Sequence, residues 1–138
     1  MSRGDIRAAL KAGLVANVAG VSDVYDYAPT SLGTASPVVM LEVEGASRRR
    51  GDFRGASIVT HRMNLHVFVA LSAAGYTEDD SQDTLDTLVE AIEDYVSRNT
   101  VGAAWKSLEF AGDSRADMVA IEGGVRRHEV IPLDIREF

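Results

Sequence analysis

The chain of 138 residues contains no cysteine, which excludes disulfide bridges, thiolate nucleophiles and zinc sites built on cysteine. It has only three prolines, and no apolar run approaches the roughly 18 residues that span a bilayer. The first residues lead into neither a long apolar segment nor a small-residue cleavage pattern, which argues against a secretory signal. We therefore expect a protein that is made and kept in the cytoplasm unless a particle carries it elsewhere.

Lysine is also scarce, since twelve of the fourteen basic residues are arginine. The 21 acidic residues outnumber the basic ones and give a formal net charge of −7. Such an acidic chain is a poor match for a protein that coats nucleic acid with its whole surface, although it does not exclude a local basic site. A hydrophobic content of 46 % and a charged content of 25 % are ordinary for a globular protein, and we predict a single domain over residues 1–138.

Apolar residues at helical spacing predict two main helices, over residues 6–17 and 80–98. Asp5 is a suitable N-cap for the first helix. Gly13 falls on its buried face, where it would allow close approach to a sheet. The second helix is strongly acidic, with eight acidic residues and no basic one between positions 78 and 94.

Most of the remaining chain is patterned as strands. Residues 58–71 alternate most clearly, with Met63, Leu65 and Val67 on one face. Pro132 lacks an N–H donor, which favours an edge position or a bulge for the last strand. The element order predicts an α+β fold with a mostly antiparallel sheet, two main helices packed on one side and a long protruding β-hairpin. The other predicted strands cover residues 24–27, 38–44, 105–110, 118–121 and 126–135.

The densest charge in this acidic chain is basic, because seven consecutive residues hold four of the twelve arginines. They lie between the strands predicted at 38–44 and 58–71, so we predict a basic loop over residues 45–55 at the hairpin tip. Two partners suit it: nucleic-acid phosphate, or the acidic helix of a neighbouring subunit. A solvated turn without a partner is the alternative. The arginines are Arg48, Arg49, Arg50 and Arg54, and the interface candidates on the acidic helix are Asp83, Asp86, Glu90, Glu93 and Asp94.

The sequence offers little support for catalysis or metal binding. His61 and His66 are separated by an odd number of residues on one strand, so they face opposite sides, and His128 with either one leaves a metal short of ligands. Glu42 and Glu44 share a strand face at a spacing that glycosidases use, but such pairs are common on solvated sheets. We expect no enzyme, no metal and no cofactor.

The layout resembles the tail terminator family of long-tailed bacteriophages, also called tail completion or minor tail proteins. The similarity extends over nearly the full length and rests on element order, size and local patterns. It is carried by the first helix, the segment Val24-Tyr25-Asp26-Tyr27-Ala28-Pro29, the strand from Pro37 to Glu44, the basic loop, the strand from His61 to Leu71, the acidic helix and the closing Val130-Ile131-Pro132-Leu133-Asp134-Ile135.

The resemblance implies a virion structural protein of the phage tail or neck, assembled in the host cytoplasm. Its subunits would form a homo-hexameric ring that caps the tail tube, stops tube polymerisation and provides the head–tail joining surface. The implied partners are further copies of the chain, the tail tube protein, a head-completion or connector protein and genomic DNA passing through the lumen, but no membrane. No cofactor and no catalytic residue is implied, and the arginines have no assigned role in the family. Another neck component, such as a head-closure or connector protein, is the alternative, followed by a nucleic-acid-binding regulator that uses the arginine loop.

Overall fold

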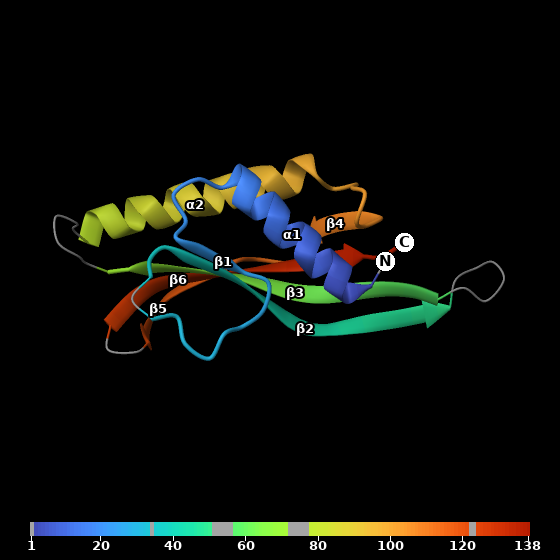
Figure 1. The fold of residues 1–138 in the computed structure, drawn as a ribbon, viewed down its shortest axis with the longest axis horizontal. Helices are drawn as coiled ribbons and strands as arrows, with labels where there is room; N and C mark the ends of the chain where they lie inside the picture. Colours follow the sequence, from blue (N-terminus) through green and yellow to red (C-terminus); the bar gives the residue numbers. More distant parts are fainter. Residues whose placement is uncertain (1, 34, 51–56, 72–77, 122–123) are drawn as a thin grey trace.

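The structure is a computed structural model that describes residues 2–33, 35–50, 57–71, 78–121 and 124–138. These residues form two helices and six strands (Figure 1). In chain order they are α1 (Arg3–Asn17), β1 (Asp23–Tyr25), β2 (Val38–Arg50), β3 (Ser57–Ala70), α2 (Glu78–Arg98), β4 (Ser107–Phe110), β5 (Arg115–Ile121) and β6 (Gly124–Arg136).

The strands form one sheet in the order β1-β2-β3-β6-β4, and β5 also pairs with β6. Only β1 and β2 pair in parallel, and the other described pairs are antiparallel. Both helices lie over the same face of the sheet (Figure 1). The predicted α+β fold is therefore confirmed. None of the helices in the described segments is long and apolar enough to cross a membrane.

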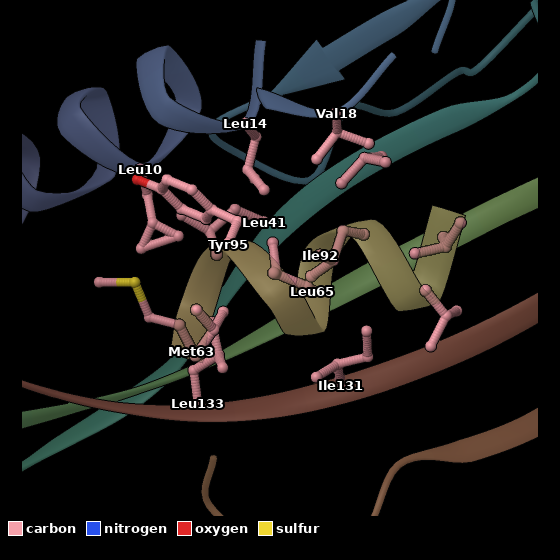
Figure 2. Packing of buried hydrophobic residues seen from close by; sticks show 14 of the residues in the cluster. Leu10, Leu14, Val18, Leu41, Met63, Leu65, Ile92, Tyr95, Ile131 and Leu133 are labelled. Carbon is pink, nitrogen blue, oxygen red and sulfur yellow. The ribbon is translucent and has the colours of Figure 1, made fainter. Parts of the chain in front are cut away.

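The core lies between the helices and the sheet, where the predicted apolar faces meet. Figure 2 shows side chains from α1, α2, β2, β3 and β6 converging there. Every second residue of β3 from Met63 to Val69 and of β6 from Ile131 to Ile135 contributes, as the alternation predicts, including Leu65 and Leu133, which are fully buried. Full burial of such a side chain stabilises the fold by roughly 1.5–3 kcal/mol.

The hairpin of β2 and β3 is much longer than an ordinary one, with strands of 13 and 14 residues against a usual five or six. Arg48, Arg49 and Arg50 belong to β2 and pair with Val59, Ile58 and Ser57 of β3. The predicted loop over residues 45–55 is therefore wrong in its first half. Cross-strand pairing extends the strand through a glycine and three arginines that local signals assign to a loop. Arg54 lies outside the described residues.

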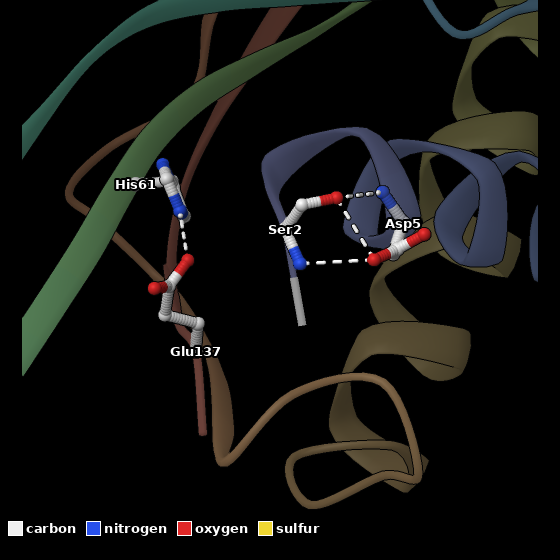
Figure 3. Close-up of polar contacts among 4 residues, drawn as sticks. All are labelled: Ser2, Asp5, His61 and Glu137. Carbon is white, nitrogen blue, oxygen red and sulfur yellow. Dashed lines mark hydrogen bonds and ion pairs between the residues drawn. The ribbon is translucent and has the colours of Figure 1, made fainter.

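Helix α1 begins earlier than predicted, because Ser2 and not Asp5 is its N-cap (Figure 3). The Ser2 hydroxyl accepts a hydrogen bond from the Asp5 N–H at 3.2 Å, and the Asp5 carboxylate accepts one from the Ser2 N–H at 2.9 Å. This reciprocal capping box satisfies two backbone donors at the helix start. The hydrogen bond from the Ser2 backbone is the main cause that lowers the pKa of Asp5.

Two further local predictions need correction. Gly13 does allow a close approach, but to the ring of Tyr95 on α2 and not to the sheet. Pro132 lies in β6, which has neighbours on both sides, and no bulge interrupts its pairing with β3. The missing donor is tolerated because the Pro132 backbone faces the gap between β5, whose pairing ends at Val130, and β4, whose pairing begins at Leu133. There the Pro132 carbonyl accepts a hydrogen bond from the Ala111 N–H at 2.9 Å.

Candidate functional site

The helix-free face of the sheet collects arginines from three strands. Strand alternation directs Arg62 of β3 and Arg136 of β6 to this face. Arg49 of β2 joins them because a register shift between Val43 and Gly45 changes which residues of β2 face that way. A hollow of about 470 Å³ lies among them, lined by Arg48, Arg49, Arg62 and Arg136 together with Ser47, Ile58, Thr60 and Asp134. We call it the arginine hollow.

One carboxylate already lies in the arginine hollow. Arg62 donates from Nε to Asp134 Oδ1 at 2.6 Å and from Nη2 to Oδ2 at 3.3 Å. This hydrogen bond, with the charge of Asp134, raises the pKa of Arg62. Within the described part of the chain, Arg48, Arg49 and Arg136 form no ion pair. The hollow thus has guanidinium groups in excess of its single carboxylate.

The predicted acidic residues form one exposed stripe on α2. At 100° per residue, Asp83, Asp86, Glu90, Glu93 and Asp94 fall within an arc of about 100°, and all are exposed. Asp94 pairs with Arg98 at 3.3 Å, both largely exposed, and Asp86 accepts a hydrogen bond from Gln82 at 2.7 Å. We call these five residues the acidic stripe.

The structure does not bring the predicted basic and acidic residues together within one molecule. The arginine hollow lies on the helix-free face of the sheet, whereas α2 packs on the opposite face. The two are also offset along the molecule, because α2 begins at the end away from the β2–β3 tip (Figure 1). Any contact between them must therefore join two molecules.

A hydrogen-bonded chain on the helix-free face escaped prediction from the sequence. Asp117 Oδ1 lies 2.8 Å from His128 Nδ1, His128 Nε2 lies 2.8 Å from His66 Nδ1, and His66 Nε2 lies 3.1 Å from Glu42 Oε1. The four residues come from β5, β6, β3 and β2 in turn, so the chain links four strands. The ring of Phe68 stacks on His128 with centroids 4.5 Å apart and planes 7° from parallel.

The two histidines of this chain lie between two carboxylates. Because ionised carboxylates only accept hydrogen bonds, the ring nitrogens that face Asp117 and Glu42 are the donors. Burial, as the main cause, lowers the pKa of His128, so the folded state favours its neutral ring. The hydrogen bond with His66, as the main cause, lowers the pKa of Glu42.

The other histidine and the glutamate pair are held by structural contacts. His61 lies on the helix side of the sheet, opposite His66 as predicted, and bonds to Glu137 at 2.8 Å (Figure 3). Asn64 donates to both Glu42 and Glu44, at 3.3 and 3.1 Å. Among the described residues no group of three or more His, Asp or Glu could hold a metal ion.

Comparison with known proteins identifies no family. No family model matches the chain, and no curated protein matches it. A chain in the solved virion of a native gene transfer agent particle is similar, with a TM-score of 0.44 and 19 % sequence identity. The alignment covers 98 % of this chain and 90 % of that chain. At this level of similarity the match does not bear on function.

Proposed function

We propose that the protein is a virion structural subunit that assembles into a ring on the end of a phage tail tube. In this role it stops tube polymerisation and provides the surface that joins tail to head. The element order that carries the sequence resemblance to tail terminator proteins is present in the fold, from α1 through the long β3 to the closing β6. The partners are further copies of the chain, the tail tube protein and a head-completion or connector protein, with genomic DNA passing through the lumen.

The observation that carries this proposal is the length and charge of the β2–β3 hairpin. Its far end extends past the two helices (Figure 1) and bears Arg48, Arg49 and Arg50, all exposed. The core of its own molecule contributes little to the stability of such a long, polar hairpin end. It is well placed to reach a neighbouring subunit, as a ring of identical subunits requires.

The acidic balance suits a ring through which DNA moves. A net charge of −7 leaves most of the surface repulsive to phosphate, so a lumen lined by this protein would not hold DNA in place. The hydrogen-bonded chain on the helix-free face connects strands to one another, which makes the sheet rigid, as a structural subunit requires.

Electron microscopy and sedimentation of the purified chain test the proposal. The expected result is a closed ring with a central opening, and its attachment to one end of tail tubes built from the tube protein of the same genome. The proposal would be refuted by a chain that stays monomeric over the accessible concentration range and does not bind to tube ends. Rings that attach to portal-side components and never to tubes would favour a head-closure or connector protein instead.

A nucleic-acid-binding regulator is the second candidate, because four arginines line the arginine hollow. It predicts sub-micromolar binding to duplex DNA with a steep salt dependence. The triple variant Arg48→Ala/Arg49→Ala/Arg50→Ala separates the two functions. Loss of DNA binding with normal ring assembly supports the regulator, whereas defective assembly of a folded variant supports the ring.

A further inference from the structure

We propose that the acidic stripe of one copy docks into the arginine hollow of the next copy. This inference rests on the proposed ring and names the contact that would build it. The two surfaces have opposite charge, and each has charged groups that its own molecule leaves without an ion-pair partner in the described residues, such as Arg49 and Arg136 in the hollow and Glu90 and Glu93 on the stripe.

The chemistry of the hollow suits carboxylates. Arg62 already holds Asp134 through a fork of two hydrogen bonds, which is the favoured geometry between guanidinium and carboxylate. Arg49 and Arg136 offer the same donors to a carboxylate from outside, and the exposed acids of α2 supply carboxylates on short side chains. Arginine suits such partly dehydrated pairs better than lysine does.

The lengths of the two surfaces also correspond. Beside the arginine hollow, a second hollow of about 410 Å³ shares Arg62 and is lined by Glu44, Asp113 and Arg115, so charges of both signs are present there. From the level of Arg49 to that of Arg62 is about 13 Å along β3. From Asp83 to Asp94 is about 16 Å along α2. The acidic stripe is therefore long enough to place carboxylates along the whole of the arginine hollow.

The placement of the two surfaces fixes the symmetry of the contact. The hollow and the stripe lie on opposite layers of one two-layer body (Figure 1), so two molecules cannot satisfy both contacts with each other at once. The contact is heterologous, and repeating it leads to a closed ring where the rotation permits or to an open helix where it does not.

Charge exchange tests the contact directly. The hollow variant is Arg49→Glu/Arg136→Glu, and the helix variant is Asp86→Lys/Glu90→Lys. Each should fail to assemble alone, since the exchanged residues then meet charges of their own sign. An equimolar mixture should recover assembly through alternating copies, because each variant supplies the charge that the other needs. Sedimentation and electron microscopy of the separate and mixed proteins measure this outcome.

Controls separate charge from folding. Lys11→Glu/Lys106→Glu makes the same change in net charge as the hollow variant, at exposed positions outside both surfaces, and should assemble like the wild type. Recovery in the mixture itself shows that both variants fold. If Arg136→Glu unfolds the chain, Arg48→Glu/Arg49→Glu makes the exchange on the exposed hairpin alone.

The failures are distinguishable. Wild-type rings that persist in both variants, or a mixture that fails to recover, overturn this contact while the ring itself stands. A wild type that never assembles overturns the ring and the contact together. A hollow variant that assembles normally but no longer shifts duplex DNA assigns the arginine hollow to phosphate and overturns the docking of the stripe.

Discussion

Replacing Gly13 by alanine tests the packing between the two helices. In an open helix position this change stabilises a protein by about 1 kcal/mol, because glycine is the poorer helix former. Gly13 is not open. A Cβ at this position would lie 1.8 Å from Tyr95 Oη and 2.4 Å from Cζ, and Tyr95 is only 7 % exposed. The tyrosine ring must move for the methyl group to fit.

The magnitude follows from the two opposing effects. Overpacking a core typically costs about 1–3 kcal/mol, and an overlap this deep belongs at the upper end. With the helix-propensity gain of about 1 kcal/mol subtracted, Gly13→Ala should lower the free energy of unfolding by about 2 kcal/mol. Urea denaturation followed by circular dichroism measures this difference.

Two companion variants make the test specific. Gly4→Ala is the matched control in the same helix, since its Cβ would meet only the Ser2 hydroxyl at 3.7 Å. It should not destabilise the fold. In a Tyr95→Ala background the obstruction is gone, so Gly13→Ala should become stabilising. A Gly13→Ala protein that is more stable than the wild type, or whose effect keeps its sign in that background, would refute this account of the helix contact.

Two more predictions concern the helix-free face. Burial lowers the pKa of His128 from 6.5, so the folded state favours the neutral ring. The stability that this ring contributes is present above pH 6.5 and is lost as the pH falls below that value. The lowered pKa of Glu42 causes a further loss of stability below pH 4.5. The free energy of unfolding should therefore fall as the pH is lowered. His128→Gln should flatten the dependence of that free energy on pH between pH 7 and about 5. An unchanged slope would contradict the lowered pKa of His128. Separately, buried Arg126 donates to the Ala35 carbonyl at 2.6 Å, so Arg126→Met should cost about 1–3 kcal/mol in urea denaturation, and a neutral effect would show that this anchor is dispensable.

Hydrophobic periodicity predicted the helices and strands that bury one face and expose the other. The apolar face of residues 80–98 and the alternation around Met63 and Leu65 each correspond to a buried surface, because every position in the repeat meets the same core. The residues at which helices and strands begin and end were less predictable. Helix α1 begins before Asp5, since Ser2 and Asp5 are both acceptable caps and only the reciprocal hydrogen bonds choose between them.

The polar chain on the helix-free face could not be predicted because it depends on register. His66 and His128 are 62 residues apart, and they meet only because β3 and β6 pair with Phe68 opposite His128. A shift of one residue would direct the two rings to opposite faces. The sequence shows the alternation of each strand but not the offset between strands, which the core packing and the turns determine together.

The same dependence on register decides which arginines line the hollow. Before the shift at Val43 and Gly45, odd-numbered residues of β2 such as Leu41 face the helices. Uninterrupted alternation would therefore direct Arg49 toward the helix side. The shift reverses the alternation, so that Arg49 faces outward beside Arg62 and Arg136. A run of three arginines fixes only the amount of charge at the hairpin end. The irregularity at a glycine determines the face on which that charge meets the arginines of two other strands, and so the surface that a partner contacts.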